Sequence, residues 1–241
     1  MLRKVLVGLA AAAALAAPAP AQTLDELIAK ANDARGGLAR IKAVQSVRMT
    51  GRMTMGPGVE APITLEMKRP RSTRMEFTVQ GQTGVQAYDG KQAWGISPMG
   101  NRKPEPLPDE MARDIDAQAD LDGPLVDYKA KGHQVELVGK ETVDGTEAWK
   151  LKLSPKGGEA QYVFLDASSF LEIRNEAHRL VRGQEMDIVS TFSDFKEAGG
   201  VVWPHKIQAG PKGRTEKQVL SFDKIEVNPP IEDARFKMPS R

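Results

Sequence analysis

The chain of 241 residues contains no cysteine. It therefore forms no disulfide bond, has no thiol nucleophile and cannot be lipid-anchored through an N-terminal cysteine. A chain without disulfides depends on a hydrophobic core for its stability. Histidine is almost as scarce, because only His133, His178 and His205 occur and they share no short spacing. The sequence therefore predicts no metal site built from histidine and cysteine.

The sequence also lacks the short motifs of common catalytic and phosphate-binding sites. It has no G-x-S-x-G motif and no glycine-rich phosphate loop. Seven acidic residues cluster between Asp109 and Asp127, in an order typical of a solvated helix face rather than of a calcium loop. We therefore predict no catalytic residue, no metal and no cofactor. A carbohydrate hydrolase stays open as the enzymatic alternative, because paired carboxylates are defined by their separation in space.

Long apolar runs are absent apart from Val5–Ala17, which is too short for a membrane span of about 20 residues. Arg3 and Lys4 precede this run, and the small residues Ala19 and Ala21 follow it, as in a secretory signal peptide cleaved after Ala21. The mature chain then has 32 basic and 32 acidic residues. This balance gives no positive field to attract nucleic acid. We expect a protein of the bacterial periplasm.

Hydrophobic periodicity predicts one helical region followed by many strands. The capping box TLDE and a helical apolar stripe predict a helix over Leu24–Lys42, interrupted at Gly36–Gly37. From Val44 onward, apolar and polar residues alternate through about eleven segments, and Asp89–Gly90 is typical of a hairpin turn. Such alternation predicts an antiparallel sheet with one solvated face. A sheet of that many strands must curl, close or split into layers.

The segment 98–132 interrupts the alternation. The four prolines between residues 98 and 108 exclude a central strand, and Pro108, followed by Asp109 and Glu110, is a typical helix start. No linker of low complexity and no internal repeat divides the chain. We therefore predict a signal peptide over 1–21 and a single domain over 22–241, in which 98–132 is a helical insertion.

Methionines gather on one face of the predicted sheet. In VRMTGRMTMG the methionines share the parity of Val47, while the arginines and threonines have the other parity. Methionine is flexible and polarizable, so this face suits either an irregular core, the commoner case, or a soft apolar ligand. The N-terminal helix and the insertion are available to cover it. The residues that we expect to line a ligand cavity are Met49, Met53, Met55, Leu65, Met67, Phe77, Trp149 and Phe164.

Five stretches occur in an order that is known from one family: ARGGLARIKAVQSVRMTGRM, YDGKQAWGISP, YVFLDASSFLEIRNEAHRL, TFSDFKEAGGVVWPHKI and FKMP. Together they span essentially all of the mature chain, and they resemble the LolA-like superfamily of periplasmic proteins that sort outer-membrane lipoproteins. The resemblance implies a mainly β (α+β) fold. It consists of a curved, unclosed antiparallel half-barrel of about eleven strands, with an N-terminal helix and a helical lid.

The resemblance also implies a function. It implies a carrier that holds the acyl chains of a lipoprotein or lipid on their way toward the outer membrane, with envelope membrane proteins as donor and acceptor. In the well-studied carrier of the family, an arginine near the cavity mouth holds the lid shut. Arg48 and Arg52 lie on the parity opposite to the methionines, so neither matches that role. A module that senses lipid or supports the envelope through a protein partner stays open as the alternative.

Overall fold

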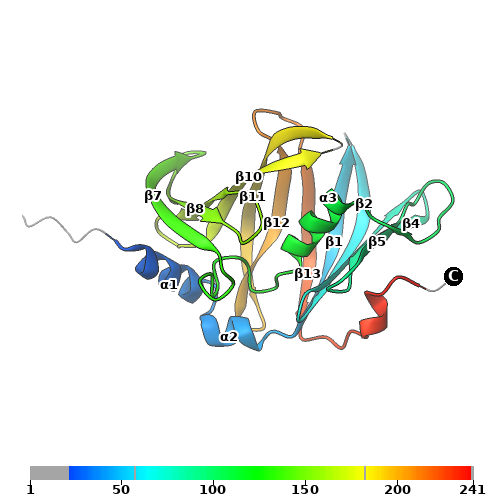
Figure 1. Cartoon of the computed structure of the whole chain (residues 1–241), viewed down its shortest axis with the longest axis horizontal. Coiled ribbons are helices and arrows are strands. Elements are labelled where there is room, and N and C mark those ends of the chain that lie inside the picture. The colour runs from blue at the N-terminus through cyan, green and yellow to red at the C-terminus, as the bar shows by residue number, and fades with distance from the viewer. Residues whose placement is uncertain (1–21, 57, 182, 240–241) are drawn as a thin grey trace, which may run out of the picture.

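The computed structural model describes residues 22–56, 58–181 and 183–239, and within them the chain forms one antiparallel sheet of 13 strands (Figure 1). The strands are β1 (Ser46–Gly56), β2 (Val59–Lys68), β3 (Ser72–Val79), β4 (Gln82–Tyr88), β5 (Ala93–Ile96), β6 (Glu105–Pro106), β7 (Gln134–Val143), β8 (Thr146–Ser154), β9 (Gln161–Asp166), β10 (Glu172–Val181), β11 (Gln184–Ala198), β12 (Val201–Pro211) and β13 (Gln218–Val227). Their order in space is β6-β5-β4-β3-β2-β1-β13-β12-β11-β10-β9-β8-β7. The sheet is curved and remains open between β6 and β7.

The central strand β1 defines the two faces of the sheet. Met49 lies opposite Leu65 of β2 and Ile225 of β13, and residues directly opposite each other point to the same side. We call this side the inner face, because the helices cover it. Arg48 lies opposite Glu66 and belongs to the outer face. The predicted separation of the methionines from the arginines of β1 is therefore confirmed for these two residues.

The predicted N-terminal helix divides at its glycines. It forms α1 (Leu24–Ala34), which begins with the predicted capping box at Thr23, and α2 (Leu38–Ala43). Gly36 has a φ of 113°, and a Cβ added there would collide with the carbonyl oxygen of Gly200. Glycine is therefore required where the chain turns against the β11–β12 connection. The backbone N–H of Val202 donates to the Arg35 carbonyl at 2.9 Å in the same place.

The insertion contains the third helix, α3 (Asp109–Gln118), which begins where Pro108 and the two acids predict. Figure 1 shows α3 in the space between the two wings of the sheet, with α1 and α2 near one end. Helix α3 contacts β4 and β5. None of its residues is buried, so it lies on the inner face without being part of the core.

The C-terminal segment covers part of the outer face. It contains the 3-10 helix η1 (Asp233–Arg235), and the indole Nε1–H of Trp94 donates to the Phe236 carbonyl at 2.7 Å. Val85, Ala87 and Trp94 form a small apolar cluster beneath it. This segment closes the outer side of β4 and β5, so the inner side is the one left for the helices.

The fold class is confirmed, and the strand number is slightly higher than expected. The described residues form 13 strands rather than about eleven. One of the additional strands is β6, a two-residue strand that contains Pro106. Proline is tolerated there because β6 lies at the edge of the sheet, where its missing N–H interrupts no ladder.

Candidate functional site

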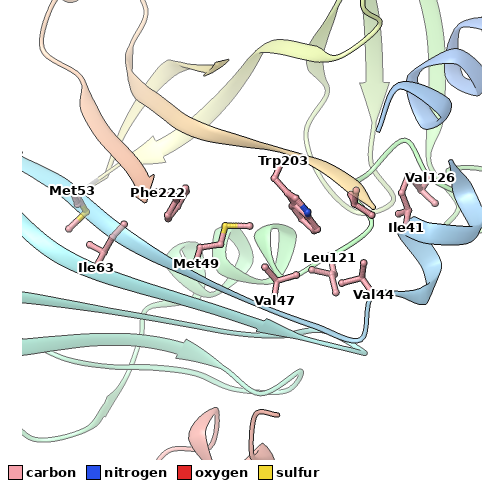
Figure 2. Close-up of a cluster of buried hydrophobic side chains, with 11 residues drawn as sticks. Ile41, Val44, Val47, Met49, Met53, Ile63, Leu121, Val126, Trp203 and Phe222 are labelled. Carbon is pink, nitrogen blue, oxygen red and sulfur yellow. The ribbon is translucent and has the colours of Figure 1, made fainter. Parts of the chain in front are cut away.

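The inner face of the central strands carries a large apolar cluster (Figure 2). Met49 and Met53 of β1 are 6 % and 3 % exposed and point toward Trp203 of β12 and Phe222 of β13. Leu121 and Val126 of the insertion and Ile41 of α2 complete the same cluster. The centre of the inner face is therefore filled by segments of the chain that do not belong to the sheet.

The central cluster is surrounded by apolar side chains that are only partly buried. Leu65, Met67 and Phe77 belong to this border, together with Ile207 and Leu220 on the other side of β1. They lie on the inner face of four strands, β2 and β3 on one side of β1 and β12 and β13 on the other. These border side chains are partly exposed, whereas Met49 and Met53 are buried within the cluster.

The structure places seven of the eight predicted cavity residues, in three groups. Met49, Met53, Leu65, Met67 and Phe77 come together on the inner face of β1–β3. Trp149 is on the same face but borders a second cluster, formed with α1. Phe164 lies on the outer face, because it stands opposite Lys150 and Arg174 in its neighbouring strands and packs with Val143 and Ala148. The side chain of Met55 is outside the described part of the structure.

The second inner cluster joins α1 to the other wing of the sheet. Leu27 of α1 packs with Leu151, Val163 and Leu165, and Leu125 and Tyr128 of the insertion take part. The insertion thus contributes to both clusters. Any movement that detaches it exposes apolar surface on both wings.

A cluster of charged side chains anchors the insertion to the sheet. The Arg69 guanidinium donates to both carboxylate oxygens of Asp122, at 2.5 and 2.9 Å, and to the carbonyl oxygens of Val44 and Ile41. This hydrogen bonding with Asp122 raises the pKa of Arg69 and lowers the pKa of Asp122. The Arg35 Nη1 donates to the Asp122 carbonyl at 2.6 Å. Asp122 therefore joins the insertion to α2 and to the β2–β3 turn.

Helix α3 is held by ion pairs to the β2–β3 turn and to β10. The Arg71 Nε lies 2.9 Å from an Asp116 carboxylate oxygen, next to the β2–β3 turn. The Arg179 Nε of β10 lies 3.2 Å from an Asp114 carboxylate oxygen. All four side chains are between 30 % and 41 % exposed, so each pair is worth at most about 1 kcal/mol. Helix α3 therefore has no buried residue and is held on the inner face by partly exposed ion pairs.

A small pocket lies where α1, the insertion and β10 meet. Its lining includes Asn32, Arg35, Leu125, Phe170 and Glu172. Burial raises the pKa of Glu172 to about 7, although the positive charge of Arg35 acts in the opposite direction. A carboxyl group that titrates near neutral pH therefore lies beside the anchor of the insertion.

The two arginines that the sequence singled out have a different role. The Arg48 Nε donates to Glu66 at 2.8 Å, and the Arg235 Nε donates to the other oxygen of the same carboxylate at 2.6 Å. Glu66 is 1 % exposed. Arg48 thus helps to attach the C-terminal segment to the outer face, while Arg52 pairs with exposed Glu60. The arginines that bind the insertion are Arg35, Arg69, Arg71 and Arg179, which sequence reasoning missed.

Among the described residues, no group of three or more histidine, aspartate or glutamate side chains is placed to hold a metal ion. Likewise, no helix in the described part is long and apolar enough to cross a membrane.

Comparison with solved structures identifies the fold. The chain is similar to a LolA superfamily protein from Nitrosomonas europaea (TM-score 0.59, 16 % identity, covering 90 % of this chain and 98 % of that one). It is also similar to a DUF1329 family protein from Desulfovibrio piger (TM-score 0.63, 14 % identity, 89 % and 97 % covered). A third match is a domain named for outer membrane lipoprotein sorting from Vibrio parahaemolyticus (TM-score 0.60, 12 % identity, 87 % and 95 % covered).

These likenesses show that the chain has the LolA-like fold over nearly its whole described length. No protein-family model matches the chain, and the search of the curated proteins found no match. The predicted resemblance is therefore confirmed at the level of fold.

Proposed function

We propose that this protein is a periplasmic carrier that holds acyl chains of a lipoprotein or lipid against the inner face of its sheet and moves them toward the outer membrane. The observation that carries the proposal is the partly buried apolar border around the central cluster, which includes Leu65, Met67 and Phe77. Weak ion pairs hold α3 over this face. In this view residues 1–21 are a signal peptide, residues 22–241 form one domain and residues 98–132 are its lid.

The energetics favour reversible binding. Each buried CH₂ group contributes about 0.8 kcal/mol, so a chain of about a dozen carbons gains roughly 10 kcal/mol. Opening the lid and ordering the chain offset much of this gain. Because the contacts of α3 are partly exposed ion pairs, the cost of opening stays small. A carrier requires this balance, since it must also release its cargo.

The test is the binding of a fluorescent fatty acid to Leu65→Glu. Leu65 faces Met49 and Met75 across neighbouring strands, so a carboxylate there would have to be desolvated by the bound chain. That desolvation costs at least about 2 kcal/mol, so we expect binding at least about 30-fold weaker than wild type. Phe77→Glu is the second variant, because it changes the same border at another strand. Both are preferable to a change at Met53, which is buried and would destabilise the fold.

The matched control is Thr50→Glu, which places the same charge on the outer face of β1, opposite Lys224. It should bind the fatty acid like wild type. Equal binding by wild type, Leu65→Glu and Phe77→Glu would rule out the inner face as the acyl site. Native mass spectrometry of protein purified from its own periplasm gives the direct readout. A stable complex with another protein and no extractable lipid would instead favour a sensing or structural role.

A further inference from the structure

The antiparallel topology brings five connections to the end of the sheet that lies away from α2 (Figure 1). We call this end the hairpin rim. In the described residues it consists of residue 58, residues 80–81 and 97–104, residue 183 and residues 212–217.

The hairpin rim is basic. Its described connections contain five lysines and arginines but only one acidic residue, Glu216. The mature sequence as a whole is neutral, so this end concentrates positive charge. In the described part of the chain, Arg102, Lys103, Arg214 and Lys217 form no ion pair, while Lys212 pairs with Glu176 at 2.7 Å. Four cations are therefore free to meet an anionic surface.

The same end also exposes apolar side chains. Six large apolar residues are exposed in the described structure, and three of them lie at or beside the hairpin rim. Met99, at 67 %, is the most exposed and precedes Arg102 and Lys103 in one connection. The others are Val59 and Leu180, at the rim ends of β2 and β10. Apolar tips beside cations are the pattern of a surface that contacts a bilayer at its headgroups.

The hairpin rim adjoins the inner face. An open hollow of about 600 Å³ lies there, lined by Met186, Asp187, Pro211, Lys212, Arg214 and Glu216. Met186 and Pro211 lie on the inner face, whereas Lys212 and Arg214 belong to the rim. A chain that passed from a bilayer to the inner face by this route would leave its headgroup among these charges.

We infer that the hairpin rim docks on the surface of an anionic phospholipid bilayer, with Met99 entering the headgroup layer and the basic residues facing the lipid phosphates. Charge complementarity and the gathering of exposed apolar tips at this end support a bilayer over a protein partner. The inference deepens the proposed function, because it names the surface at which cargo would enter or leave.

The test is flotation of the purified mature protein with phosphatidylcholine vesicles, with and without phosphatidylglycerol. We expect binding only to the vesicles that contain phosphatidylglycerol, and loss of binding as salt screens the charges. The variant Arg102→Glu with Lys103→Glu should bind these vesicles at least about 30-fold more weakly, since each basic residue near an anionic surface contributes about a fivefold gain. Met99→Ser should weaken binding in phosphatidylglycerol vesicles as well.

The matched control is Lys91→Glu with Lys206→Glu, which makes the same change in charge away from the rim and should bind like wild type. Equal binding by the rim variant and this control, equal binding to both vesicle types, or no binding by wild type would each overturn the inference. Fatty-acid binding without vesicles separates the two proposals. The rim variant should keep it, whereas Leu65→Glu should lose it and still float with the vesicles.

Discussion

Replacing Arg69 by alanine should lower the free energy of unfolding by about 4 kcal/mol at pH 7. The substitution removes both hydrogen bonds to the Asp122 carboxylate and those to the Val44 and Ile41 carbonyls. The Asp122 side chain is only 13 % exposed, and breaking a buried pair from one side costs about 3–5 kcal/mol because the remaining charge is left without a partner. Urea unfolding of the variant and of wild type measures the difference.

Arg71→Ala is the matched control for Arg69→Ala. Arg71 also binds a carboxylate of the insertion, but both partners of its pair with Asp116 are 41 % exposed, so the loss should stay below about 1 kcal/mol. Arg69→Lys should recover little of the loss, because lysine cannot reproduce the two parallel hydrogen bonds. Equal losses for Arg69→Ala and Arg71→Ala would contradict the assignment of Arg69 as the main anchor.

The Arg69 variant also has a pH signature. Hydrogen bonding with Arg69 lowers the pKa of Asp122, so this group stabilises the fold above its unfolded pKa of about 3.8 and loses that contribution as the pH falls through its folded pKa. The difference in stability between wild type and Arg69→Ala should therefore shrink in acid. A difference that stays constant down to low pH would show that the lost stability comes from the carbonyl contacts alone.

Much of the fold could be predicted because it depends on local patterns. The period of two in β1, the capping box at Thr23 and the glycine pair at residues 36–37 each have a local physical meaning, and each appears in the structure as expected. The number of strands was harder to predict. A two-residue edge strand such as β6 has too few residues to show a period.

The candidate site was predicted less completely, because it depends on which strands become neighbours. Phe164 shows the problem: its strand alternates, but no local signal tells which parity faces the helices. The anchors are a second case, since Arg69 and Asp122 are 53 residues apart in sequence. The sequence offered one signal for these anchors. Arg69 and Arg71 flank Pro70 in a turn, and basic residues favour pairing with the acidic residues of the insertion. Their partners follow only from the tertiary structure.

Replacing Glu172 by glutamine should stabilise the protein at pH 8 by about 3 kcal/mol and leave its stability at pH 4 nearly unchanged. Burial raises the pKa of Glu172 from 4.5 to about 7. A carboxyl group with a raised pKa stabilises the fold fully below its unfolded pKa, and this contribution is lost as the pH rises through the folded pKa. The loss therefore occurs between about pH 4.5 and pH 7, and a shift of this size corresponds to about 3 kcal/mol. Glutamine cannot ionise, so the Glu172→Gln variant does not lose this stability as the pH rises.

Glu176→Gln on the same strand is the control, and it should have the opposite sign. Although burial acts to raise the pKa of Glu176, hydrogen bonds from Lys212 and Arg174 outweigh this effect and lower it. Removing the negative charge of Glu176 should therefore destabilise the protein above pH 4.5. Urea unfolding of the three proteins across this range measures both effects. A Glu172→Gln variant whose stability follows wild type at every pH would show that Glu172 is solvated and that no pH-dependent strain acts where the insertion meets α1 and β10.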